Sequence, residues 1–160
     1  MENLKQFLIP IILFILATGC EDVRLHSFHS LQGGEWSASD TLEYAYCVPD
    51  GRNDSFMMDI QLRCEASYPY RELWLGVQCL ADSVGLFSAD TLCCEIFDSL
   101  GQHRGATNGI LYQTTHKLGV RKFPAGDTVR VKLYHIMDCG TVKGVTDAGI
   151  KITSLSQHQF

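Results

Sequence analysis

The sequence lacks the basic run that a nucleic-acid-binding protein needs. Its 160 residues carry 13 Lys and Arg against 18 Asp and Glu, a formal net charge of −5. Because such proteins neutralise several phosphates with clustered basic side chains, we expect no nucleic-acid partner. Charged residues of both signs are also scarce, at 19% against about 25% in typical domains. With 46% hydrophobic residues, the chain can bury a core, which excludes a disordered, collagen-like or coiled-coil protein and favours one domain.

No apolar run is long enough to cross a membrane as a helix. The longest is Phe7–Leu16, whereas a bilayer core of about 30 Å needs roughly 20 helical residues. Its length is typical of the apolar part of a signal peptide, and it ends at the small residues of Ala17-Thr18-Gly19-Cys20. This ending resembles a lipobox and predicts that residues 1–19 are removed and that Cys20 is lipidated. An ordinary secretory signal with an incidental cysteine is the alternative.

The mature chain is expected to begin with a tether. Residues 20–35 have no clear alternation, and we interpret them as the lipidated N-terminus and a link to a domain over residues 36–156. His26 and His29 have neither Cys nor acidic partners at zinc-binding spacing, so they are expected to be solvated tether residues. The sequence offers no other metal-ligand spacing and no cofactor motif.

A period of two dominates the rest of the chain. Apolar residues alternate with polar ones in six segments, at 42–48, 56–62, 73–78, 92–97, 129–134 and 150–153. Turn-forming Gly, Pro, Asn and Asp residues separate these segments, and no stretch shows an apolar helical stripe. The pattern predicts an all-β protein: a single antiparallel β-sandwich of about seven or eight strands, jelly-roll or immunoglobulin-like.

The sequence has no C-x-x-C motif, which argues against a redox centre or a zinc ribbon. Six cysteines remain after Cys20, an even number that would permit disulfides in an exported protein: Cys47, Cys64, Cys79, Cys93, Cys94 and Cys139. Most of them lie in apolar strand-like segments, where a free cysteine packs as a small hydrophobe. Buried free thiols are favoured slightly over a framework of three disulfides.

Tyr68, Tyr70 and Trp74 are the candidate partner-binding residues. Aromatic side chains around the fixed backbone of Pro69 form a rigid, amphipathic surface of the kind that anchors interfaces or stacks on sugars. A place in the sandwich core is the equally weighted alternative. Asp98-x-x-Gly101-x-x-x-Gly105 fits a tight turn better than a cation loop, because it has too few oxygen ligands at alternate positions.

Several short sequence motifs follow the lipobox in a fixed order. The most specific are Tyr68-Pro69-Tyr70-x-x-Leu73-Trp74 and Asp98-x-x-Gly101-x-x-x-Gly105, with Trp36 before them and Tyr134-His135-Ile136-Met137 after them. In these strings the mature chain resembles the GldH family of gliding-motility lipoproteins. The resemblance implies an envelope lipoprotein associated with gliding and the linked type IX secretion system, and it implies no enzymatic reaction.

Two functions follow as expectations. The first is a lipid-anchored, non-enzymatic component of the gliding machinery, on the outer membrane or facing the periplasm, whose partners are the membrane and other gliding or secretion proteins. The alternative is a carbohydrate-binding surface lipoprotein, since β-sandwiches often bind sugars. No motif of a hydrolase, metalloprotease or paired-carboxylate enzyme is found. His135 is expected to be a hydrogen-bonded structural residue.

Overall fold

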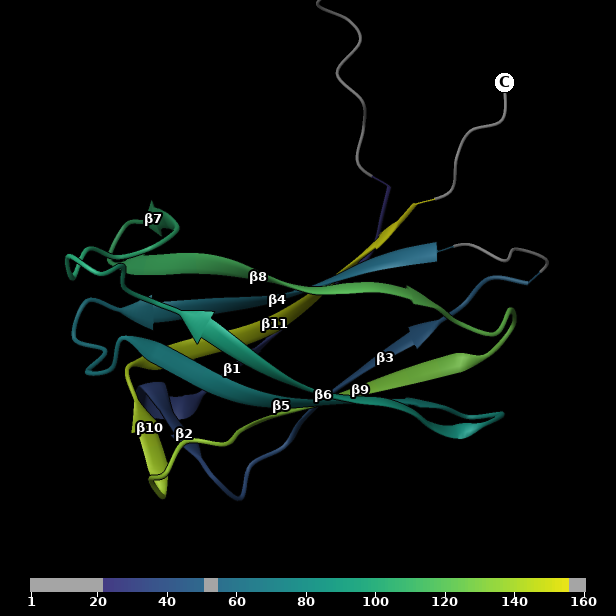
Figure 1. Cartoon of the computed structure of the whole chain (residues 1–160), viewed down its shortest axis with the longest axis horizontal. Helices are drawn as coiled ribbons and strands as arrows, with labels where there is room; N and C mark the ends of the chain where they lie inside the picture. The colour runs from purple at the N-terminus through teal and green to yellow at the C-terminus, as the bar shows by residue number, and fades with distance from the viewer. Residues whose placement is uncertain (1–21, 51–54, 156–160) are drawn as a thin grey trace, which may run out of the picture.

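Two antiparallel β-sheets pack face to face in the computed structural model, which describes residues 22–50 and 55–155 (Figure 1). The strands are β1 (Val23–Ser30), β2 (Glu35–Ser37), β3 (Leu42–Cys47), β4 (Ser55–Glu65), β5 (Glu72–Ala81), β6 (Gly85–Glu95), β7 (Ala106–Asn108), β8 (Leu111–Lys122), β9 (Thr128–His135), β10 (Thr141–Lys143) and β11 (Val145–Ser154). Within the described residues the only helical segment is the short 3-10 turn η1 (Gln32–Gly34). None of the described helices could span a membrane.

The strand order is that of a jelly roll. One sheet has the order β1-β11-β4-β8-β7 and the other β3-β9-β5-β6, and a separate pair joins β10 to β2. Along the chain the eight longer strands alternate between the two large sheets except at the β5–β6 hairpin, as two Greek keys require. The predicted antiparallel β-sandwich is therefore confirmed. The strand count rises to eleven because β2, β7 and β10, of three residues each, have no resolvable alternation.

The alternating segments place one row of side chains from each long strand into the core. Members of these rows are almost fully buried: Phe56, Met58, Ile60, Leu62, Leu73, Leu75, Val77, Val129, Val131, Leu133, Ile150 and Ile152. Trp36 from β2 closes one end of this core, where its indole Nε1 donates a hydrogen bond to the Asp40 carbonyl at 3.1 Å. Apolar burial of this kind is the main favourable term in folding.

The tether prediction is wrong for residues 23–30, and the domain begins well before residue 36. These residues form β1, which pairs with β11 from Val23↔Thr153 to Ser30↔Asp147. His26 and His29 are strand residues, not tether residues. The His26 ring Nε2 lies 2.6 Å from Gln61 Oε1 of β4, and the His29 ring Nε2 bonds to the Glu43 carbonyl at 2.9 Å.

The sequence concealed β1 because its clearest apolar residue faces outward. The Phe28 ring lies on the outer face of its sheet, packed over Gly149, and the Arg63 guanidinium stacks on it at 4.0 Å from the ring centre. A glycine in one strand covered by an aromatic ring from its neighbour is a known way to stabilise a pair of strands. Leu25 is only partly buried against the core, so the inward-facing residues of β1 show no clear hydrophobic alternation in the sequence.

Gly149→Ala should therefore destabilise the domain by about 2 kcal/mol through overpacking. A Cβ at this position would lie 2.5 Å from Phe28 Cδ1 and 2.7 Å from the Ser27 carbonyl oxygen, so β1 would have to move. Gly140→Ala is the matched control, because a Cβ there meets no atom within 4 Å. Urea denaturation of both variants measures the effect. Equal stabilities would contradict the packing of β1 described here.

The six described cysteines are all free, as the sequence slightly favoured. Cys64, Cys79 and Cys94 are buried in the core, whereas Cys47 is exposed on β3. Burial raises the pKa of the Cys64 thiol to about 12, so this group stays protonated at neutral pH. The buried cysteines therefore act as small apolar residues of the core.

Candidate functional site

Tyr68 is a core residue, and its assignment as a partner-binding side chain is wrong. Its side chain is 3% exposed, its ring stacks on Phe97, and its hydroxyl donates to the Glu72 carbonyl at 3.0 Å. Burial raises the pKa of the Tyr68 phenol. The alternative prediction, a place in the sandwich core, is therefore correct for Tyr68. The turn after β4 brings its side chain to the start of β5, where its hydroxyl meets the Glu72 carbonyl.

Tyr70 and Trp74, the other two candidates, lie at the surface. Their exposed fractions are 40% and 42%. Trp74 faces outward on β5 because Leu73 and Leu75, its neighbours in the alternation, are buried. The Trp74 indole Nε1 donates to Glu72 Oε2 at 3.3 Å, and this bond orients the ring. The Trp74 carbonyl accepts from the Ile136 amide at 2.9 Å, so Ile136, 45% exposed, lies beside it.

Five of the nine exposed large hydrophobic side chains of the described residues, including both aromatic ones, lie at one end of the sandwich, where β5 and β8 begin and β6 and β9 end. Two loops at this end carry the most exposed large hydrophobic residues of the described chain, Leu100 at 81% and Ile110 at 86%. We call this surface the apolar end and define it by Tyr70, Trp74, Leu100, Ile110 and Ile136. Leu100 and Ile110 were not predicted from the sequence, although each is a large apolar residue beside a turn glycine, which was the available signal.

The opposite end of the sandwich holds the start of β1 and the end of β11 (Figure 1). The Ser154 amide donates to the Asp22 carbonyl at 2.9 Å there, so the two chain segments lie together. Val23, Val84, Val120 and Leu155 are the exposed large hydrophobics of this half. None of them is aromatic, whereas Trp and Tyr, the residues most enriched at interfaces, lie at the apolar end.

The loop that presents Leu100 is held by the predicted tight turn. Asp98 Oδ1 accepts hydrogen bonds from the Leu100 amide at 2.8 Å and the Gln102 amide at 2.9 Å, and these bonds lower the pKa of the Asp98 carboxyl, the Gln102 amide most. Gly101 has a φ of 76°, a conformation that favours glycine. The His103 ring stacks on Tyr112 at 3.6 Å and ties the loop to β8. The turn prediction is confirmed, and Leu100 stands on a fixed backbone.

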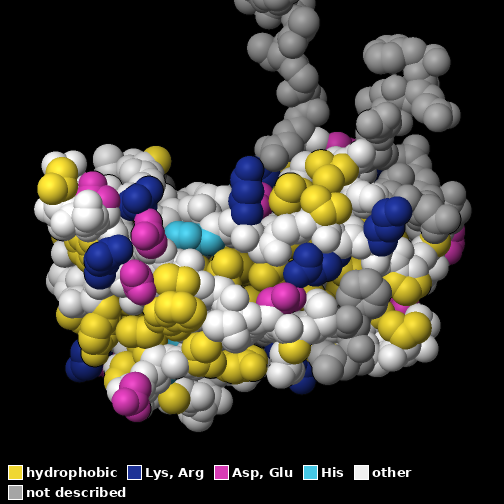
Figure 2. All heavy atoms as spheres, viewed as in Figure 1, with side chains coloured by type: hydrophobic (Ala, Val, Ile, Leu, Met, Phe, Trp, Pro, Cys, Tyr) yellow, Lys and Arg dark blue, Asp and Glu magenta, His cyan; other side chains and the backbone are white. Residues whose placement is uncertain are grey.

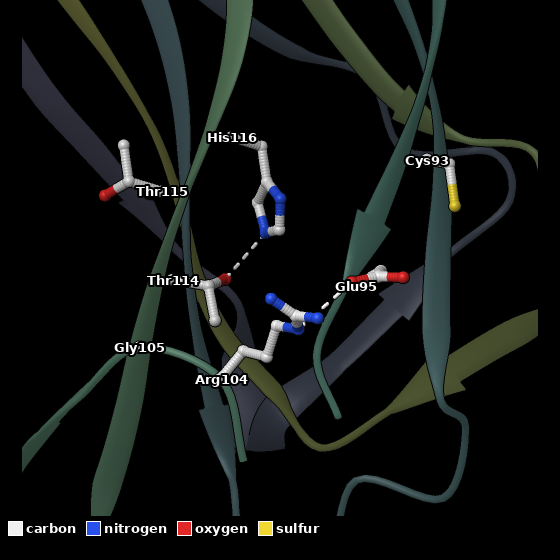
Figure 3. Close-up of a pocket in the computed structure, with 7 residues that line it drawn as sticks. All are labelled: Cys93, Glu95, Arg104, Gly105, Thr114, Thr115 and His116. Atoms are coloured by element: carbon white, nitrogen blue, oxygen red, sulfur yellow. Dashed lines mark hydrogen bonds and ion pairs between the residues drawn. The ribbon is translucent and has the colours of Figure 1, made fainter. Parts of the chain in front are cut away.

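A cleft of about 410 Å³ opens between the edges of β6 and β8 (Figure 3). It is lined by Cys93, Glu95, Arg104, Gly105, Thr114, Thr115 and His116. Arg104 Nε pairs with Glu95 Oε2 at 3.0 Å, and the His116 ring Nε2 lies 2.9 Å from Thr114 Oγ1. The cleft therefore presents polar groups that already have partners within the protein.

The Cys93 thiol and the His116 ring do not form a nucleophile–base pair. The Cys93 sulfur points away from His116 (Figure 3). Burial and the nearby Glu72 raise the pKa of the Cys93 thiol, the reverse of what an activated cysteine needs. Burial also lowers the pKa of His116, which favours its neutral form. Among the described residues, no group of three or more His, Cys, Asp and Glu side chains is placed to hold a metal ion.

Several basic side chains of the molecule are paired with acidic ones. Figure 2 shows Lys and Arg alternating with Asp and Glu between hydrophobic patches. Arg121 Nη2 lies 2.9 Å from Asp90 Oδ2 and bridges β8 to β6 across the open edge of the sandwich. Charges turned inward at sheet edges discourage the pairing of further strands. Addition of a partner's strand to these edges is therefore disfavoured.

His135 is buried, but it is not the hydrogen-bonded residue that the sequence predicted. Its side chain is 3% exposed and packs edge-on against the Trp36 ring at 5.9 Å between centres. Neither ring nitrogen makes a hydrogen bond of good geometry, although the Trp36 backbone lies close enough to favour the charged form slightly. Burial outweighs that contact and lowers the pKa of His135.

The stability of the domain should fall as the pH drops through and below the ordinary histidine pKa of 6.5. Because the folded-state pKa of His135 lies below its ordinary value of 6.5, the unfolded chain binds protons first on acidification. This contribution to stability is complete above the unfolded pKa and is lost below it, down to the folded pKa. Urea denaturation across this pH range should show a smaller loss for His135→Phe. An unchanged slope in that variant would contradict the assignment.

A model of the GldH lipoprotein family matches residues 24–152 of the chain. The matched range begins inside β1 and ends inside β11, so it covers nearly the whole jelly roll. It includes the apolar end and the cleft between β6 and β8. No curated protein matches the chain.

Solved structures resemble the chain only distantly. The PRD1 vertex protein P5 has a TM-score of 0.47 at 9% identity, with 86% of this chain and 100% of that chain covered. The carbohydrate-binding module CBM36, solved with calcium and xylotriose, has a TM-score of 0.37 at 11% identity, covering 83% and 91%. The plant receptor-like kinase ANX2 has a TM-score of 0.42 at 12% identity, covering 83% of this chain and 31% of that chain.

Proposed function

Since the chain belongs to the GldH lipoprotein family, we propose that it is a non-enzymatic component of the gliding-motility machinery, linked to type IX secretion, that acts by protein–protein contact. The family makes it a membrane-anchored envelope protein. The observation that carries the proposal is the gathering of exposed aromatic and aliphatic side chains at the end of the sandwich opposite the start of β1.

The position of the proposed lipid anchor determines which end of the sandwich faces away from the membrane. Cys20, which lies outside the described residues, precedes the first residue of β1, Val23, by only three positions. A lipid on Cys20 therefore holds the β1 end of the domain near the membrane. The apolar end then faces away from the lipid, where a second envelope protein can reach Trp74 and Leu100. The outer membrane or the periplasmic side of the envelope is the favoured location.

The chemistry of the cleft supports a role without catalysis. An activated cysteine needs a lowered pKa and a base within hydrogen-bond reach. Cys93 has a raised pKa, and its sulfur points away from His116. Arg104 and Glu95 neutralise one another. These features favour a contact protein over an enzyme.

Affinity capture from mild-detergent envelopes tests the proposal. The intact lipoprotein should recover other gliding or secretion proteins, and Trp74→Ala should weaken this binding by about 2 kcal/mol, roughly thirtyfold. Val84→Ala is the matched control, because Val84 is 61% exposed at the opposite end. Equal recovery by both variants would place the contact elsewhere. Recovery of no envelope protein would overturn the proposed function.

A further inference from the structure

We propose that the outer face of the four-stranded sheet binds an uncharged oligosaccharide. Two hollows of about 470 and 480 Å³ lie on this face. Both are lined by Glu43 of β3 and Lys132 of β9, so they adjoin one another across this pair of residues, and we call the two hollows together the groove. Each volume lies within the range of about 300–1,000 Å³ that ligand pockets occupy. The inference goes beyond the proposed function, because none of the residues that line the hollows belongs to the apolar end, although Trp74 faces outward from the same sheet.

The register of the sheet explains why the groove forms here. Gly76 of β5 pairs with Tyr134 of β9, and in the next row of the same face Gln78 pairs with Lys132, which pairs with Glu43. A Cβ on Gly76 would collide with the end of the Tyr134 phenol ring, so the ring lies over the glycine. The missing side chain at Gly76 therefore makes room for the Tyr134 ring, which lines one of the hollows.

The lining suits a ligand that offers both hydroxyl groups and C–H surfaces. The Gln78 carboxamide Nε2 donates to the Tyr134 hydroxyl at 3.4 Å, and both groups line one hollow together with the Thr41 hydroxyl. A carboxamide, a phenol and an aliphatic hydroxyl can each donate and accept, as sugar hydroxyls do. The half-buried Tyr134 ring adds an aromatic surface for the apolar side of a sugar ring.

The charges in the groove are already paired, which indicates an uncharged ligand. Lys132 Nζ lies 3.1 Å from Glu43 Oε1, and Arg130 makes two contacts with the Asp82 carboxylate, at 2.6 and 3.3 Å. Each pair neutralises itself but keeps spare donors and acceptors at its edges. An anionic polymer would gain no net attraction from such a surface. A chain of neutral sugars can bond to both members of a pair.

Titration with oligosaccharides tests the inference. Uncharged tetrasaccharides of glucose, mannose, xylose and N-acetylglucosamine are added at millimolar concentration, and backbone amide NMR shifts and the melting temperature are recorded. At least one should raise the melting temperature in a saturable way, because a ligand that binds only the folded state stabilises it. The amide shifts should centre on Gln78 and Lys132. No shift with any tetrasaccharide would overturn the proposal.

A pair of matched variants tests whether the oligosaccharide binds in the groove. Gln78→Ala should weaken binding about tenfold, because a sugar hydroxyl loses its partner. Gln113→Ala is the control, since Gln113 lies on the outer face of the other sheet, where it accepts from Arg63. Equal binding by the two variants would contradict the groove. Gln78→Ala should leave the recovery of envelope proteins unchanged, so the two proposals can fail separately. Melting of each variant in the absence of sugar confirms that it folds.

Discussion

Tyr68→Ala should destabilise the domain by about 3–5 kcal/mol, whereas Trp74→Ala should cost less than about 1 kcal/mol. The two aromatic residues are six positions apart, but only Tyr68 is in the core. Its removal leaves a cavity against Phe97 and takes away the hydroxyl that donates to the Glu72 carbonyl. Trp74 is 42% exposed, so its removal leaves no enclosed cavity, and its hydrogen bond to the Glu72 carboxylate lies at the surface.

Thermal and urea denaturation of both variants measure this difference. Tyr70→Ala serves as a second surface variant, since Tyr70 is 40% exposed and packs edge-on against the Tyr68 ring. A large loss of stability in Trp74→Ala would place the indole in the core and remove it from the apolar end. A stable Tyr68→Ala variant would contradict the described packing of the turn between β4 and β5.

Cys20→Ala should abolish the incorporation of a fatty acid into the protein. If the lipobox prediction is correct, the Cys20 thiol and the new N-terminus carry all the acyl chains of the mature protein. Each buried CH₂ contributes about 0.8 kcal/mol to membrane binding, so chains of ordinary length hold the protein firmly. Cells grown with an alkyne-labelled palmitate should therefore label the wild-type protein and leave the variant unlabelled.

Cys47→Ala is the matched control for this experiment. Cys47 is an exposed free cysteine of the described domain, so it is the other thiol most open to acylation. Labelling should be unchanged in this variant. Labelling that persists in Cys20→Ala would contradict the lipoprotein prediction, and labelling lost in Cys47→Ala would move the acylation site to β3.

The fold could be predicted from the sequence where burial is one-sided. Val129, Val131 and Leu133 alternate with polar residues because β9 has one face in the core and one in solvent, and this pattern correctly indicated an antiparallel sandwich. The same reasoning from alternation did not identify β1 as a strand. Phe28 packs on the outer face over Gly149, a contact between residues far apart in the chain that no local pattern reveals.

The candidate site was predictable only in part for a similar reason. The sequence identified Trp74 and Tyr70, but it could not separate them from Tyr68, because the three share one aromatic segment. Their burial depends on how the turn after β4 meets Phe97 from a distant loop. The groove of Glu43, Gln78 and Lys132 was missed entirely, since it arises from the register of three strands.

Site-specific photocrosslinking in intact cells tests the central claim most directly. Benzoylphenylalanine replaces Leu100 or Ile110 at the apolar end, and Val84 at the opposite end, in the full-length lipoprotein. If the apolar end is the contact surface, Leu100 and Ile110 should crosslink to other gliding or secretion proteins, and Val84 should crosslink to none of them. Crosslinks to envelope proteins from Val84 alone would contradict it, because the contact surface would then lie at the membrane-facing end.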